Sequence, residues 1–90
     1  MEIKVKANVN IMEAYNIFVD DEKVLKVRGN KVTTLKVSDD EHTLQLNGSS
    51  GKSSVVKISK PHSSNDIVSL EFNTDWACAF KEGYFKLVGE

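Results

Sequence analysis

Two short acidic clusters, Asp20–Glu22 and Asp39–Glu41, are the residues of this chain best suited to bind a metal ion. Each interrupts a stretch of alternating apolar and polar residues, and is therefore predicted to form a turn between strands. In an up-and-down meander, alternate turns lie at the same end of the sheet. The side chains that could then converge as oxygen ligands for a cation such as calcium are Asp20, Asp21, Asp39 and Asp40. Neither cluster has the spacing of a known calcium loop, so the favoured interpretation is that both are solvated turns.

His42, His62 and Cys78 are the other side chains that could bind a metal or act as a base or nucleophile. Neither histidine has a cysteine or a second histidine at ligand spacing, so no metal site and no cofactor is predicted. We expect His42 to form a hydrogen bond with loop backbone, and His62, after Pro61, to lie in solvent. No nucleophile-elbow sequence accompanies the serines. The lone Cys78, between two alanines, is expected to be a small buried residue rather than a reactive thiol.

The segment Gly48–Ser53 reads GSSGKS and contains letters of a phosphate-binding loop. A true P-loop has four residues between its glycines and is followed by a helix. Here only two residues separate Gly48 and Gly51, and the residues that follow are rich in β-branched side chains. We therefore predict a flexible hairpin loop at Gly48–Gly51.

The tail of the chain is its most aromatic part, with Trp76, Phe80, Tyr84 and Phe85. Exposed aromatic rings could stack on sugars or anchor a protein partner. In a chain this short they are expected instead to fill the open end of a small core. The favoured local structure is a hairpin that places Trp76, Cys78 and Phe80 together, with its tip at Glu82–Gly83. A short helix over 75–81 with Asp75 as N-cap is the alternative.

Alternation of apolar and polar residues, clearest over residues 14–46, predicts strands along most of the chain. The expected strands are Glu2–Ala7, Ala14–Asp20, Lys23–Arg28, Lys31–Ser38, His42–Asn47, Lys52–Lys60 and Asp66–Asn73. Between the first two, Ile11 and Met12 are expected to fold back over one end of the core. The core itself should include Leu35, Leu44, Leu46 and Leu70. The predicted fold class is all-β: a small antiparallel β-sandwich of seven to nine strands, forming a single domain over 1–90.

Composition narrows the possible partners. The chain has 90 residues and a net charge of −1, with a pI near 6.1. This balance lacks the basic surface of a nucleic-acid binder and argues against a polybasic membrane anchor. No stretch is long and apolar enough for a membrane span or a signal peptide, so no membrane insertion is expected. The chain is expected to be cytoplasmic if Met1 is the native start, and otherwise to be a fragment of an exported protein.

The segment Ile17–Val24, sequence IFVDDEKV, resembles the I-x-V-D-G-K-x-V hairpin of PEGA-type and related small bacterial β-domains. The segment His42–Leu46 resembles the G-x-H-x-I-x-L strand that follows in such domains. Asp21 stands where the family has its turn glycine, and Asp39–Asp40 replace the usual Pro-Gly. The resemblance covers residues 17–46 and implies a sandwich of the prealbumin or immunoglobulin type that serves as an accessory or interaction module without catalysis.

These observations predict a non-catalytic interaction or accessory module, not an enzyme. It would bind protein or carbohydrate through its sheet edges or through the aromatic residues of the tail. The alternative is a cation-dependent binding domain or an enzyme that uses the acidic turns Asp20–Glu22 and Asp39–Glu41. Exposed edge strands could also pair two copies of the chain, and the apolar pattern leaves the oligomeric state open.

Overall fold

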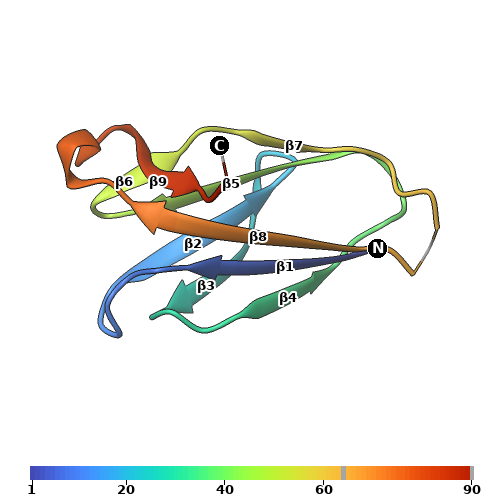
Figure 1. Ribbon diagram of the computed structural model, residues 1–90, viewed down its shortest axis with the longest axis horizontal. Coiled ribbons are helices and arrows are strands. Elements are labelled where there is room, and N and C mark those ends of the chain that lie inside the picture. Colours follow the sequence, from blue (N-terminus) through green and yellow to red (C-terminus); the bar gives the residue numbers. More distant parts are fainter. Residues whose placement is uncertain (64, 90) are drawn as a thin grey trace.

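The computed structural model describes residues 1–63 and 65–89, and its regular structure consists of nine strands and one short turn of helix (Figure 1). The strands are β1 (Glu2–Ala7), β2 (Ala14–Val19), β3 (Glu22–Arg28), β4 (Thr33–Lys36), β5 (His42–Gly48), β6 (Gly51–Ser53), β7 (Val56–Ile58), β8 (Ile67–Thr74) and β9 (Glu82–Leu87). The turn of 3-10 helix, η1, spans Trp76–Cys78. The prediction of an all-β fold with seven to nine strands is confirmed.

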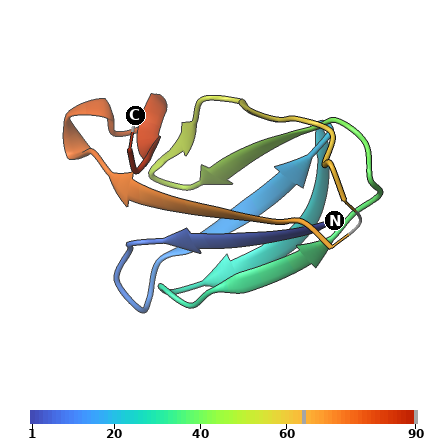
Figure 2. The same ribbon diagram turned by 45° about the vertical axis from the view of Figure 1, so that its right-hand side comes forward.

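Hydrogen bonds join the strands in the order β3-β2-β5-β6-β9-β8-β1-β4, and β7 pairs with β5 beside this path. Figures 1 and 2 show that the sheet curls round until it is nearly barrel-shaped. Two of its pairings, β1 with β8 and β6 with β9, are parallel. The prediction of a wholly antiparallel sheet is therefore wrong, because strands distant in the sequence lie side by side in the same direction.

The buried core is formed by alternate residues of the strands, as the two-residue period of apolar side chains predicts. Tyr15, Ile17 and Val19 of β2 point inward and are buried, and so are Leu44 and Leu46 of β5. They join a single buried cluster that contains Ile3, Val5, Phe72, Tyr84 and Phe85. Leu44 and Leu46 are thus confirmed as core residues, whereas Leu35 and Leu70 are only partly buried against the cluster.

The predicted strand Lys52–Lys60 is in fact two strands that interact with the same edge of β5. The break comes after Ser53, whose buried hydroxyl accepts a hydrogen bond from Leu46 N and donates one to Ser54 O, both 2.9 Å long. Ser53 itself pairs with β9, whereas Val56 pairs with β5. The chain therefore changes partner at this point.

The loop between β1 and β2 does not cover the core. Ile11 and Met12 are 73% and 70% exposed, so the predicted fold-back is wrong. The physical reason is local. The side chain of Asn10 accepts hydrogen bonds from Met12 N at 2.8 Å and Glu13 N at 3.1 Å, which closes a tight turn that projects both apolar side chains outward.

The predicted hairpin in the tail is also wrong, because β9 pairs with β8 and the connection over 75–81 contains η1. Asp75 is its N-cap and accepts a hydrogen bond from Ala77 N at 3.0 Å, as the helical alternative required. Glu82 and Gly83 open β9 and are not a hairpin tip. Of the tail aromatics, Tyr84 and Phe85 are buried in the core as expected, but Trp76 and Phe80 are exposed.

Candidate functional site: a side opening between β7 and β8

The sheet has an opening between β7 and the first half of β8. Strand β9 pairs with β8 only over Phe72–Thr74, so Ile67–Leu70 have no β9 residue beside them. On the other rim, the described pairings of β7 are with β5 alone. We call the gap between these two rims the side opening. It leaves two strand edges facing each other, which is a place where a further strand can pair.

The backbone of β8 shows which groups face the side opening. Glu2 N donates to Asp66 O, and Asn8 N donates to Phe72 O at 2.8 Å, so the even-numbered residues face β1. Glu71 O accepts from Val88 N, also at 2.8 Å, so the odd-numbered residues face the opposite edge. Because these directions alternate, the N–H and C=O groups of Ile67 and Ser69 point to the side opening.

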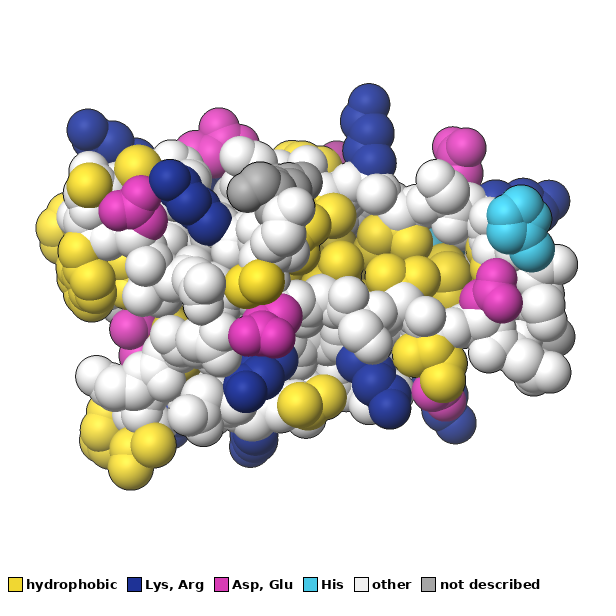
Figure 3. All heavy atoms as spheres, in the orientation of Figure 1, with side chains coloured by type: hydrophobic (Ala, Val, Ile, Leu, Met, Phe, Trp, Pro, Cys, Tyr) yellow, Lys and Arg dark blue, Asp and Glu magenta, His cyan; other side chains and the backbone are white. Residues whose placement is uncertain are grey.

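Aliphatic side chains line the groove behind this edge. Its volume is about 590 Å³, and its apolar lining includes Val55, Val56, Ile58, Val68, Leu70 and Leu87. Figure 3 shows the corresponding yellow surface between the two strands. A smaller groove of about 300 Å³ shares Val56 and Leu87 and leads toward Phe72 and Phe85. The side opening therefore exposes part of the core between two strand edges that have no pairing partner within residues 1–63 and 65–89.

Positively charged side chains predominate at the rim of the side opening. Lys57 and Lys60 line the groove and are exposed. Among the described residues of the lining, the one carboxylate is that of Asp66, which accepts hydrogen bonds from His62 N at 2.9 Å and Ser63 N at 3.3 Å. The lysines are thus the groups that favour an acidic residue on a bound segment. His62 itself is exposed, as predicted.

The other strand edges are better protected. Strand β3 has a register shift opposite Ile17 and Phe18, and it exposes Lys23 and Lys26. Strand β4 has only four residues. Bulges, lysines and short length are the usual means by which proteins prevent edge-to-edge pairing. Strand β7 is itself only three residues long and exposes Lys57, so the contrast singles out the edge of β8 at the side opening.

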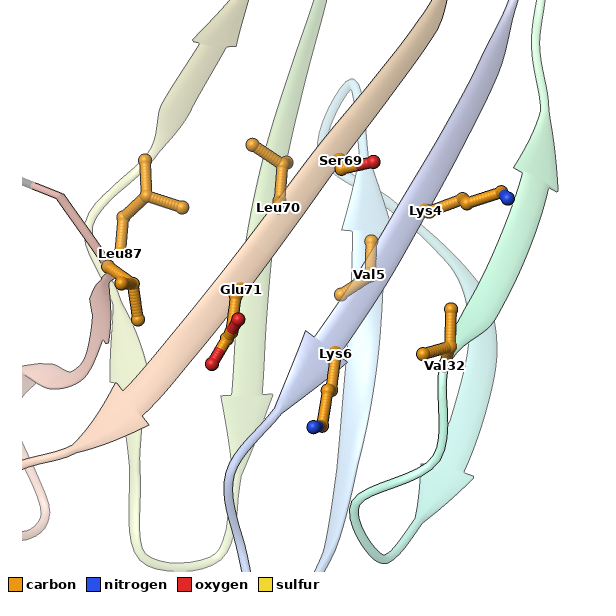
Figure 4. Close-up of a pocket in the computed structure, with 9 residues that line it drawn as sticks. Lys4, Val5, Lys6, Val32, Ser69, Leu70, Glu71 and Leu87 are labelled. Atoms are coloured by element: carbon orange, nitrogen blue, oxygen red, sulfur yellow. The ribbon is translucent and has the colours of Figure 1, made fainter.

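A second hollow, of about 550 Å³, lies over β1 and β8 (Figure 4). Figure 4 shows that the side chains of Lys4 and Lys6 come from β1 and that of Glu71 comes from β8. The strands beneath it already pair with each other, and the Glu71 carboxylate accepts a hydrogen bond from Asn8 Nδ2 at 2.7 Å. This hollow therefore offers side chains of mixed charge, and it reaches the edge of β8 that β9 leaves uncovered only at Ser69 and Leu70.

Ser38, His42 and Asp20 are connected in the same order as a serine triad. Ser38 Oγ lies 3.2 Å from His42 Nε2, and His42 Nδ1 lies 2.7 Å from Asp20 Oδ2. The second carboxylate oxygen of Asp20 accepts a hydrogen bond from Thr43 N at 2.9 Å. Sequence reasoning missed this group, because turns that are distant in the sequence bring its members together.

The protonation of His42 decides what this group can do. Nε2 also lies 3.0 Å from the carbonyl oxygen of Ser38. When both ring nitrogens carry protons, each has an acceptor: the Asp20 carboxylate for Nδ1 and the Ser38 carbonyl for Nε2. The hydrogen bond with Asp20, followed by that with the Ser38 carbonyl, raises the pKa of His42, and the same His42 contact lowers the pKa of Asp20. In that protonated state the ring cannot accept the Ser38 proton, and the arrangement acts as a clamp between two turns. The predicted bond from His42 to loop backbone is confirmed.

The two acidic clusters meet near His42 without forming a cage of oxygen ligands. Asp20 bonds to His42, whereas Asp39 Oδ1 forms an ion pair with the amino group of Met1 at 2.6 Å. Across residues 1–63 and 65–89, no group of three or more His, Cys, Asp or Glu side chains is placed to hold a metal ion.

Two further sequence motifs have structural outcomes. Gly51–Ser53 form β6 and no helix follows in the described segment, so the hairpin interpretation of GSSGKS is confirmed, with the turn at Ser49 and Ser50.

Cys78 lies in η1, half-buried and outside the core cluster, with Sγ 3.9 Å from Asp75 Oδ2. Its predicted burial in the core is wrong, because η1 lies at the surface.

Comparison of the chain with protein-family models, curated proteins and solved structures gives no match. The resemblance of residues 17–46 to PEGA-type domains therefore stays a prediction. Among the described residues, no helix has the length and apolar character needed to cross a membrane.

Proposed function

We propose that this protein is a non-catalytic binding module and that its side opening accepts an extended segment of a polypeptide partner. The observation that carries the proposal is the free edge of β8, where Ile67 and Ser69 direct backbone donors and acceptors over an apolar groove. A bound segment would add a strand to this edge, which is a common mode of peptide recognition.

The lining supports a polypeptide in preference to a carbohydrate. The side chains in the groove are mainly aliphatic, whereas sugars are usually bound by aromatic faces and polar groups. In a strand, alternate side chains point to one face, so every second residue of the partner would be apolar and would contact Val56, Val68 and Leu70. Acidic residues beside this segment would face Lys57 and Lys60.

We also propose that the fold is best described as a β-sandwich open at one side, as in prealbumin or immunoglobulin domains. One layer would contain β3, β2, β5 and β7, and the other β4, β1, β8 and β9. The unpaired edges of β7 and β8 support this description, since the side opening would then be the gap between two layers.

Selection from a library of random ten-residue peptides tests the proposed function. We expect enrichment of peptides with alternating apolar residues and acidic flanks. Ser69→Pro removes an N–H that faces the opening and leaves the hydrogen bonds between β8 and β1 intact. Binding of the selected peptides should therefore weaken by about tenfold, the value of one good hydrogen bond. Ser69→Ala is the matched control, because it keeps the N–H and should bind like the wild type. Equal binding by both variants, or no enrichment of alternating sequences, would contradict the proposal.

A further inference from the structure

Four connections lie together at one end of the molecule, which we call the loop end. Ala14 pairs with Arg28, and Tyr15 pairs with Gly48, so the connections 8–13, 29–32 and 49–50 are neighbours. Ala7 pairs in parallel with Phe72, which brings the connection 75–81 to the same end. Figures 1 and 2 both show the blue 8–13 loop and the orange 75–81 loop at the left.

The loop end carries most of the strongly exposed apolar side chains of the described chain. The five are Ile11, Met12, Val32, Trp76 and Phe80, all more than half exposed, with Phe80 the highest at 79%. Figure 3 shows yellow side chains in separate groups at the left end of the molecule. Exposed apolar side chains lose contact with water when they enter another apolar phase, which is favourable. Their distribution over separate loop tips suits a soft apolar medium more than a single rigid pocket.

The backbone holds these side chains outward. Phe80 has a φ of +64°, a left-handed conformation that costs a bulky residue about 1–3 kcal/mol. Hydrogen bonds maintain it: Phe80 N donates to Ser50 O at 2.7 Å, and Lys81 N donates to Cys78 O at 3.1 Å. In the neighbouring loop, Arg28 Nη1 donates to Met12 O at 2.8 Å. The tips are therefore presented in a fixed arrangement.

Charge is segregated along the molecule despite the small net charge. The end opposite the loop end carries six carboxylates on its two acidic turns, with the exposed Lys23 and Lys57 beside them: Asp20, Asp21, Glu22, Asp39, Asp40 and Glu41. The loop end carries the exposed cations Arg28, Lys31 and Lys81.

The carboxylates at the loop end are largely engaged. Glu13 accepts a hydrogen bond from Tyr84, and Asp75 pairs with Lys86 at 2.8 Å, whereas Glu82 is exposed and has Lys52 only as its neighbour in the strand register. An anionic surface would therefore repel the acidic end and attract the loop end.

We propose that the loop end docks on an anionic phospholipid membrane, with Ile11, Met12, Trp76 and Phe80 entering the interfacial layer. Tryptophan is favoured at this depth, and apolar side chains supply the affinity while the nearby cations set the orientation. No spanning segment is required. The proposal is independent of the side opening, which lies along the wall of the sheet and would stay accessible.

Trp76 is the chain's one tryptophan, so its fluorescence reports directly on docking. The probe is unilamellar vesicles of phosphatidylcholine with about one-third phosphatidylserine, a strongly anionic surface. We expect a blue shift of Trp76 emission on adding vesicles, and quenching when the phosphatidylcholine is brominated in its acyl chains. Neither result depends on a variant. An unchanged, unquenched spectrum with no co-sedimentation of the protein would overturn the proposal.

Variants then assign the effect to the loop end. Asn tolerates a positive φ, so Phe80→Asn should retain the fold while lowering vesicle partitioning about fivefold to tenfold. Met12→Ser should lower it about threefold to tenfold. Val24→Ser is the matched control, because Val24 is half exposed on β3, away from the loop tips, and partitioning should stay within about twofold. Equal losses for all three variants would overturn the proposal, as would an emission shift produced by self-association without vesicles.

Discussion

Replacing Gly51 with alanine tests the close contact between β6 and β9. A Cβ atom at Gly51 would lie 2.4 Å from Tyr84 Cβ, 2.8 Å from Tyr84 Cγ and 3.0 Å from Lys81 O. Carbon atoms in contact prefer a separation of about 3.5–4.0 Å, so the backbone of β6 or β9 must move by about 1 Å. Gly51 also has a φ of +140°, which alanine rarely adopts.

The expected loss of stability is the sum of the cost of this close contact and the cost of the backbone conformation. Overpacking of this kind costs about 1–3 kcal/mol, and the backbone conformation adds about 1–2 kcal/mol. We therefore expect Gly51→Ala to lower the free energy of unfolding by about 2–5 kcal/mol. A domain of this size has a total of about 5–13 kcal/mol. Since 1 kcal/mol corresponds to about 4–8 °C, Tm should fall by at least about 8 °C.

Urea and thermal unfolding followed by circular dichroism measure this change. Gly89→Ala is the control, because Gly89 also has a positive φ, +95°, but no described atom lies within 4 Å of the position that a methyl group would take there. The free energy of unfolding of that variant should fall by at most about 1–2 kcal/mol, the cost of the backbone conformation alone. If Gly51→Ala were as stable as Gly89→Ala, the close approach of β6 to Tyr84, and the pairing of β6 with β9, would be wrong.

Three further predictions concern hydrogen bonds and ions. Tyr84→Phe removes the 2.9 Å bond to Glu13 and should lower the free energy of unfolding by about 1.5–3 kcal/mol in urea titrations. Burial, together with Glu13, raises the pKa of Tyr84 to about 12, so an ultraviolet titration that ionises this phenol near pH 10 would contradict the burial. The pKa of His42 is raised, so its contribution to stability is fully present below its unfolded value of about 6.5 and is lost as pH rises through the folded value. NMR titration should show this pKa falling in Asp20→Asn, and an unchanged value would refute the clamp. Finally, millimolar calcium should leave Tm unchanged, and a clear rise would favour the cation-dependent alternative.

Local pattern predicts the strands and much of the core, because burial follows a two-residue period wherever one face meets solvent. Tyr15, Ile17, Leu44 and Leu46 illustrate this agreement. The same pattern could not predict that β1 pairs in parallel with β8, since pairing depends on contacts between distant segments. Nor could it predict the outward position of Phe80, which arises from a left-handed backbone that few bulky residues adopt.

The side opening shows the same limit. Val68, Leu70 and Phe72 alternate regularly and look equivalent in the sequence, yet only Phe72 is covered by β9. The difference depends on where β9 ends, because its last residue, Leu87, lies opposite Phe72. Likewise, the acidic clusters are recognisable as turns from the sequence, but the contact of Asp20 with His42 requires the pairing of β2 with β5.

Amide hydrogen exchange along β8 tests the side opening most directly. In the free protein, the N–H groups of Val68 and Leu70 should exchange slowly because they face β1. Those of Ile67 and Ser69 should exchange rapidly because they face the opening. A peptide selected on this site should slow Ile67 and Ser69 selectively. Equal protection of Ser69 and Leu70 in the free protein would mean that the edge is already covered and would contradict the account.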